Sequence, residues 1–93
     1  MVEETLELRG IPLSHLITYL EECGGKRLGG TDNALPITIR GEGWQAEVQR
    51  EETVTITSRF HVQAVFIHVR AHDQPSFDRL LKQFRMKVLR VGG

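Results

Sequence analysis

The fold is decided by residues 35–70, LPITIRGEGWQAEVQREETVTITSRFHVQAVFIHVR. Four short runs cover 35–40, 44–49, 53–57 and 62–70, and apolar and polar residues alternate in the first three. A period of two is typical of strands that bury one face. Gly41-Glu42-Gly43 predicts a tight turn after the first run, and Arg50-Glu51-Glu52 predicts a second turn. The last run is apolar at nearly every position, which indicates a central strand covered at least in part on both faces.

The segment before this stretch reads as a strand, a helix and a loop. Residues 5–9 alternate as a strand with one buried face would. Apolar residues then recur at helical spacing from Leu13 to Cys23, and Gly24-Gly25 supplies a left-handed stop. Residues 24–33 are rich in glycine and predict a loop.

The segment after this stretch predicts a second helix. Asp73 is its expected N-cap. Its apolar face is formed by Phe77, Leu80, Leu81, Phe84, Val88 and Val91. Residues 86–91 also alternate as a closing strand would, but helix is favoured because no turn residue separates them from the preceding helical pattern.

The predicted order is therefore β-α-β-β-β-β-α, in one α+β domain that covers residues 1–93. Two amphipathic helices bury their apolar faces against one side of an antiparallel sheet, so we expect a two-layer fold with a curved sheet. The ferredoxin-like order βαββαβ is the alternative. The sheet residues expected to face the helices are Leu6, Leu8, Leu35, Ile37, Ile39, Trp44, Ala46, Val48, Val54 and Ile56.

The opposite face of the sheet is predicted to be polar except along the last strand. If Gln63 points outward, alternation places Val65, Ile67 and Val69 on this open face. An apolar stripe on an open sheet is typical of a contact surface. Val65, Ile67 and Val69 are therefore the candidate interface of a homodimer. The alternative is that a bulge or a covering loop hides them.

Composition argues against several classes of partner. Twelve basic residues balance twelve acidic ones, whereas a general nucleic-acid binder needs an excess of positive charge. A net charge of zero also removes the self-repulsion that keeps copies apart. No apolar run approaches the roughly 18 residues that span a bilayer. A single cysteine excludes an internal disulfide, and a cytoplasmic location with no membrane partner is expected.

No catalytic or metal-binding constellation stands out in the sequence, so no catalytic residue, metal or cofactor is predicted. Seven residues separate His61 from His68, and this odd spacing places them on opposite faces of a strand. His15 and His72 add no further ligand pattern. Cys23 has no base beside it and is expected to act as a small buried hydrophobic residue.

Two glycine-rich motifs are weaker candidates for a site. Lys26 and Arg27 lie between glycine pairs, in a segment with the composition of an anion-binding loop. That segment follows a helix instead of leading into a helix N-terminus, so a plain connector is favoured. Gly92-Gly93 matches the ending of sulfur-carrier and ubiquitin-like proteins. Glycine is also a common helix cap, and the apolar helical face continues to Val91.

Three features together resemble a known family. They are Ile11-Pro12-Leu13 at the start of the first helix, Gly41-Glu42-Gly43-Trp44 in the hairpin, and Phe84-Arg85-Met86-Lys87 before a basic, glycine-ended tail. The pattern is similar to the TATA-binding-protein-like fold, and within it to the C-terminal domain of bacterial proteins related to MoaD, the small sulfur-carrier subunit of molybdopterin synthase. Here that domain would stand alone. Binding to a TATA box is not implied, because the basic groove and intercalating phenylalanine pairs are missing.

The resemblance implies a non-enzymatic interaction module that assists a molybdenum-cofactor or sulfur-carrier pathway. Expected partners are a second copy of the chain and a carrier protein. Two alternatives stay open. One is a domain that binds a small anionic ligand through Lys26 and Arg27, and the other is a sulfur carrier that acts through Gly92-Gly93.

Overall fold

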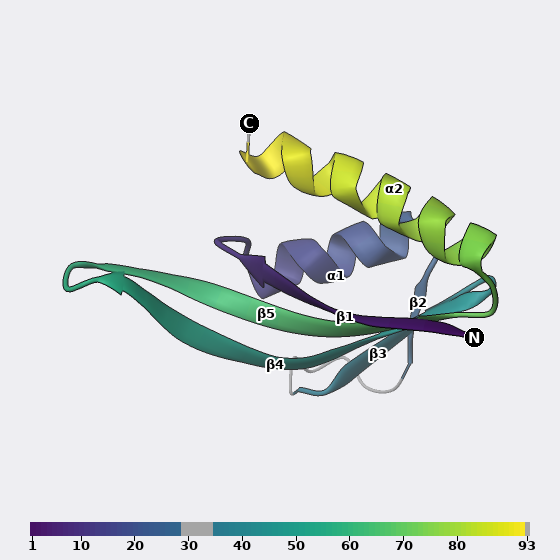
Figure 1. Cartoon of the computed structure of the whole chain (residues 1–93), viewed down its shortest axis with the longest axis horizontal. Helices are drawn as coiled ribbons and strands as arrows, with labels where there is room; N and C mark the ends of the chain where they lie inside the picture. Colours follow the sequence, from purple (N-terminus) through teal and green to yellow (C-terminus); the bar gives the residue numbers. More distant parts are fainter. Residues whose placement is uncertain (29–34, 93) are drawn as a thin grey trace.

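The computed structural model describes residues 1–28 and 35–92, with side chains described as far as residue 89. The elements are β1 (Val2–Arg9), α1 (Leu13–Glu22), β2 (Lys26–Leu28), β3 (Ile37–Gly41), β4 (Trp44–Thr57), β5 (Phe60–Ala71) and α2 (Gln74–Gly92). The strands form one antiparallel sheet in the order β1-β5-β4-β3-β2. Both helices lie on the same side of this curved sheet (Figure 1). The predicted α+β order is confirmed.

The final segment settles the choice between the two predicted architectures. Residues 86–91 belong to α2, which continues to Gly92. A ferredoxin-like fold would need a closing strand at this place. Helix is therefore confirmed for residues 86–91, and the ferredoxin-like alternative is wrong.

Two predicted boundaries inside the sheet are wrong, and the two errors compensate in the element count. The segment expected to be a loop contains a short strand at Lys26–Leu28, which pairs with β3, while residues 29–34 lie outside the described part of the chain. The expected turn at residues 50–52 is absent, because β4 runs on through it and pairs with β5. A bulge between Val48 and Arg50 absorbs one extra residue instead.

The ends of the helices follow local rules. At the end of α1, Gly24 has a φ of 100°, and its N–H donates to the carbonyl of Glu21 at 3.0 Å. The N–H of Gly25 donates to the carbonyl of Leu20 at 3.1 Å, which completes a Schellman cap. At the start of α2, a carboxylate oxygen of Asp73 accepts a bond from the N–H of Ser76 at 2.9 Å, as expected for an N-cap.

The core lies between the helices and one face of the sheet. The three side chains proposed as an interface, Val65, Ile67 and Val69, are part of it and are at most 1% exposed. The prediction that they face outward is wrong. Alternation along β5 holds, but Gln63 lies on the same face as these three residues, at a point beyond the helices. The other core residues are Ile11, Leu16, Ile17, Leu20, Ile37, Ile39, Trp44, Ala46, Val48, Ala71, Phe77, Leu80, Leu81 and Phe84.

The strands β4 and β5 are longer than the layer of helices that covers them. β1 pairs with β5 only as far as Ala64, and β3 pairs with β4 only as far as Val48. Beyond these points, residues 53–63 form a two-stranded hairpin that projects past both helices (Figure 1). We call this hairpin the arm. Val54 and Ile56, both expected in the core, lie in the arm instead, and Ile56 is 53% exposed.

Candidate functional site

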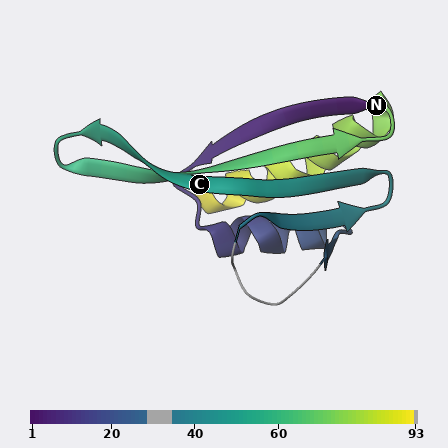
Figure 2. The ribbon, with the colours of Figure 1, turned by 90° about the horizontal axis from the view of Figure 1, so that it is seen from below.

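The sheet face turned away from the helices, here called the open face, is covered by neither helix (Figure 2). Register and alternation fix which side chains lie on it. On β5 they are Phe60, Val62, Ala64, Phe66, His68 and Arg70, which alternate with the residues that face the helices; of these six only Ala64 is fully buried. The open face therefore changes from polar near Arg70 to apolar along the arm.

One row of directly paired residues crosses all five strands at the polar end. The row reads Lys26, Arg40, Gln45, Arg70 and Glu3. A guanidinium nitrogen of Arg40 donates to the side-chain oxygen of Gln45 at 3.2 Å, and Nε of Arg70 donates to Oε1 of Glu3 at 3.0 Å. Lys26 and Arg40 stand directly opposite each other and are paired with no carboxylate among the described residues. This part of the open face is therefore basic.

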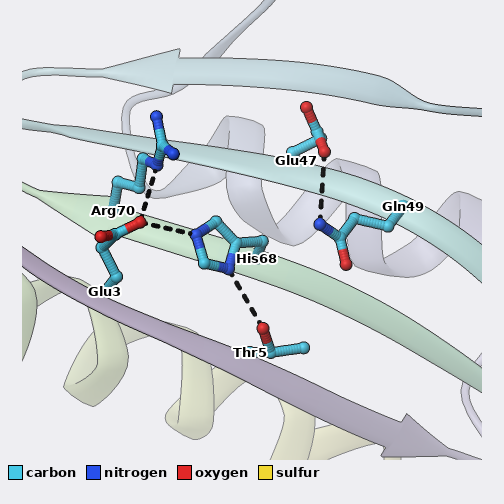
Figure 3. A network of polar contacts seen from close by, with 6 residues as sticks. All are labelled: Glu3, Thr5, Glu47, Gln49, His68 and Arg70. Atoms are coloured by element: carbon cyan, nitrogen blue, oxygen red, sulfur yellow. Dashed lines mark hydrogen bonds and ion pairs between the residues drawn. The ribbon is translucent and has the colours of Figure 1, made fainter.

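His68 connects this row to the next one (Figure 3). Its Nε2 lies 3.0 Å from Oε1 of Glu3, and its Nδ1 lies 3.1 Å from the hydroxyl of Thr5. Because a carboxylate only accepts, Nε2–H must donate to Glu3, and in the neutral ring Nδ1 then accepts from Thr5. The pKa of Glu3 lies below its ordinary value, first because of the bond from His68 and then because of Arg70. The network thus fixes the imidazole and leaves Glu3 charged.

An apolar strip occupies the other end of the open face. Its members are Phe66, Val62, Val54, Ile56 and Phe60, the last two at 53% and 56% exposure. Ala64 lies in the same row of β5 but is 0% exposed and adds no accessible surface. Val54 pairs directly with Val62 across the arm. The guanidinium of Arg50 lies over the Phe66 ring, 4.4 Å from its centroid. The strip therefore begins under a cation–π contact and becomes more exposed toward the tip of the arm.

A hollow of about 440 Å³ lies on the other side of the molecule, at the end of α1. Its walls come from the α1 C-terminus, the β3–β4 turn and the first half of α2. They are formed by Cys23, Gly24, Glu42, Gly43, Trp44, His72, Ser76, Arg79, Leu80 and Gln83. Burial raises the pKa of the Cys23 thiol, so this sulfur is a poor nucleophile at neutral pH.

The structure does not bring Lys26 and Arg27 together as an anion cradle. They are neighbours in β2 and therefore point to opposite faces of the sheet. Lys26 is exposed on the open face, whereas Arg27 is half-buried on the helix side. Sequence reasoning missed Arg40 and Arg70, which join Lys26 in the basic row. Only the pairing of strands could have found them.

The remaining candidates are placed as follows. Gly92 is the last residue of α2, and Gly93 lies outside the described residues. Within residues 1–28 and 35–92, no group of three His, Cys, Asp or Glu could hold a metal ion. His61 lies in the arm, with Nδ1 at 3.1 Å from the hydroxyl of Thr55. No helix in the described chain is long and apolar enough to cross a membrane.

A family model described as archaeal MoaD-like protein matches residues 4–93, almost the whole chain. No curated protein sequence matches.

Proposed function

This chain belongs to the archaeal MoaD-like protein family, and from that premise we propose that it is a non-catalytic interaction module of a molybdenum-cofactor or sulfur-carrier pathway. The family suggests the link to such pathways. The mode of action is our proposal: the chain self-associates through the apolar strip of the open face, with a second copy as the partner.

The observation that carries this proposal is the arm. A two-stranded hairpin with no third strand and no helix is marginally stable in water. This one also exposes Ile56 and Phe60 on the face that carries the strip. If two arms stack strip against strip, each supplies the second layer that the other lacks. The arm is therefore better explained as part of an interface than as an isolated extension.

The charges around the strip favour a second copy over a partner of one sign. Arg50 and Glu52 flank it on β4, and they form an ion pair of 3.4 Å. Glu7 and Arg9 flank it on β1 and form another of 2.7 Å. A two-fold interface brings identical patches together, so a patch that carries both signs can complement itself. The chain has no net charge to oppose this contact.

The size of the strip sets the expected affinity. Its two strands, about eight residues long, cover roughly 260 Å² per copy at about 3.4 Å per residue and about 4.8 Å per strand. The total falls below the roughly 1,200 Å² of a stable interface. The dimer should therefore be weak and depend on protein concentration.

Sedimentation velocity over a concentration series tests this reading. We expect the sedimentation coefficient of the wild type to rise with concentration, and Phe60→Asp to stay monomeric because it buries a charge in the strip. The matched control is Thr55→Asp, which adds the same charge to the other face of the arm and should behave as the wild type. A wild type that stays monomeric throughout, or a control as disruptive as Phe60→Asp, would refute self-association through the strip.

The link to a pathway needs a separate test. Deleting the gene in the source organism should lower the activity of its molybdenum enzymes or the level of its thiolated products. Unchanged levels of both would argue against an accessory role, whatever the oligomeric state.

A further inference from the structure

The hollow at the end of α1 is independent of the open face and has the features of a ligand site. Its volume of about 440 Å³ lies within the range typical of small-molecule pockets. Trp44 and Leu80 supply apolar wall, and both are less than 10% exposed. Most of the other lining side chains are polar, and they come from α2, from the turn between β3 and β4 and from His72, between β5 and α2.

The wall formed by α2 carries a line of polar groups. Ser76, Arg79 and Gln83 are spaced at i, i+3 and i+7, which places them on one face of the helix. Arg79 forms no ion pair with a carboxylate in the described part of the chain. Among the groups that lower the pKa of Asp73, the bond from the Ser76 N–H has the largest effect and the charge of Arg79 has the smallest. The guanidinium of Arg79 is therefore available to an anion.

The facing wall carries a carboxylate. Glu42 lies in the β3–β4 turn, lines the same hollow and has no ion-pair partner among residues 1–28 and 35–89. Glu42 and Arg79 are therefore more than 4 Å apart, with the hollow between the elements that hold them. Two opposite charges that line one hollow without pairing are matched by a ligand that is anionic at one end and donates hydrogen bonds at the other.

The walls are held in place by backbone contacts. The N–H of His72 donates to the carbonyl of Gly43 at 2.8 Å. A side chain at Gly43 would start 3.1 Å from the hydroxyl oxygen of Ser76, so the turn packs closely on the first turn of α2. The distance between the two polar walls is thus fixed before a ligand arrives, which lowers the entropic cost of binding.

We propose that this hollow binds a small anionic nitrogen heterocycle. Its phosphate or carboxylate group contacts Arg79, with Ser76 and Gln83 as further hydrogen-bonding groups. Adjacent N–H groups of the ring donate to the two oxygens of Glu42. The ring itself packs against Trp44 and Leu80. The open face takes no part in this site.

Guanosine monophosphate is a suitable probe, because it joins a phosphate to a ring edge with adjacent N–H donors. Guanosine and inorganic phosphate are its two halves. Titration calorimetry on the full chain should give a lower Kd for the nucleotide than for either half. Arg79→Gln should raise the Kd of the nucleotide about tenfold or more, and Glu42→Gln should raise it by a similar factor. Arg85→Gln, on another face of α2, is the matched control and should leave it unchanged.

Two results would overturn the proposal. One is the absence of nucleotide binding at millimolar concentration. The other is binding that neither Arg79→Gln nor Glu42→Gln weakens, which would place the nucleotide elsewhere, for example on the basic row of Lys26, Arg40 and Arg70. The Phe60→Asp variant should bind the nucleotide as the wild type does, so failure of the ligand site and failure of self-association are distinguishable. Circular dichroism confirms that each variant is folded.

Discussion

Replacing two isoleucines by alanine tests which face of the sheet is buried. Ile67 is fully buried in β5, where it pairs with Leu6 on one side and Val48 on the other. Ile56 lies in the arm and is 53% exposed. The same three carbon groups are removed at both positions. The difference in unfolding free energy between the two variants therefore reports burial alone.

The expected magnitudes differ about fourfold. At Ile67 the lost transfer energy is about 2.4 kcal/mol, at about 0.8 kcal/mol for each buried carbon group. A cavity of roughly 80 Å³ adds up to about 2 kcal/mol at about 24 cal/mol per Å³, for a total near 4 kcal/mol. At Ile56 only about half of the transfer energy applies and no cavity is left, so about 1 kcal/mol is expected.

Urea denaturation measures both values. Far-ultraviolet circular dichroism follows the backbone, and the fluorescence of Trp44, the only tryptophan, follows the core. In a thermal scan, Ile67→Ala should lower the Tm by roughly 15–30 °C and Ile56→Ala by less than about 10 °C. The protein must be dilute, so that the arm is not covered by a second copy. Equal losses at the two positions, or a larger loss at Ile56, would refute the assignment of the odd-numbered β5 residues to the core.

Two further predictions concern titrating groups. The folded-state pKa of Glu3 lies below its ordinary value of 4.5, so its contribution to stability is fully present above that pH and is lost as the pH falls through the folded pKa. Glu3→Gln should therefore flatten the acid side of a plot of urea midpoint against pH, whereas the control Glu51→Gln should not. If the acid side of the plot is unchanged in Glu3→Gln, the network with His68 and Arg70 is contradicted. Burial raises the pKa of Cys23 above 9.0, so its alkylation by iodoacetamide at pH 8, followed by mass spectrometry, should be at least about threefold slower than in the urea-unfolded chain. Equal rates in the folded and unfolded chain would contradict that burial.

Local patterns predicted much of the architecture. The glycine pair after Cys23 forms the Schellman cap that ends α1, and Asp73 caps α2 as its sequence context indicates. These features depend on residues within one turn of each other, so local sequence contains the necessary information. The charged run at residues 50–52 misled the prediction, because charge is typical both of a turn and of a strand that has left the core.

The site was harder to predict than the fold. Alternation along β5 divides its residues between the two faces of the sheet. The prediction placed the set with Val65, Ile67 and Val69 on the open face, whereas the structure buries it. The polar residues His68 and Arg70 belong to the set that includes Phe66, and this was the available signal that the set faces outward. The hollow joins Cys23, Glu42 and Arg79, which lie in three separate segments of the chain. No local pattern relates them.

The sequence by itself determined the α+β class with its two helices, the end of α1, the start of α2 and membership of the MoaD-like family. Only the tertiary structure decided which face of β5 is buried, how far β4 and β5 extend beyond the helices, and which charged residues meet. The physical reason is that a period of two defines two faces without saying which one a helix will cover. That choice depends on strand register and on the length of the covering layer, and both are set by contacts between residues far apart in the chain.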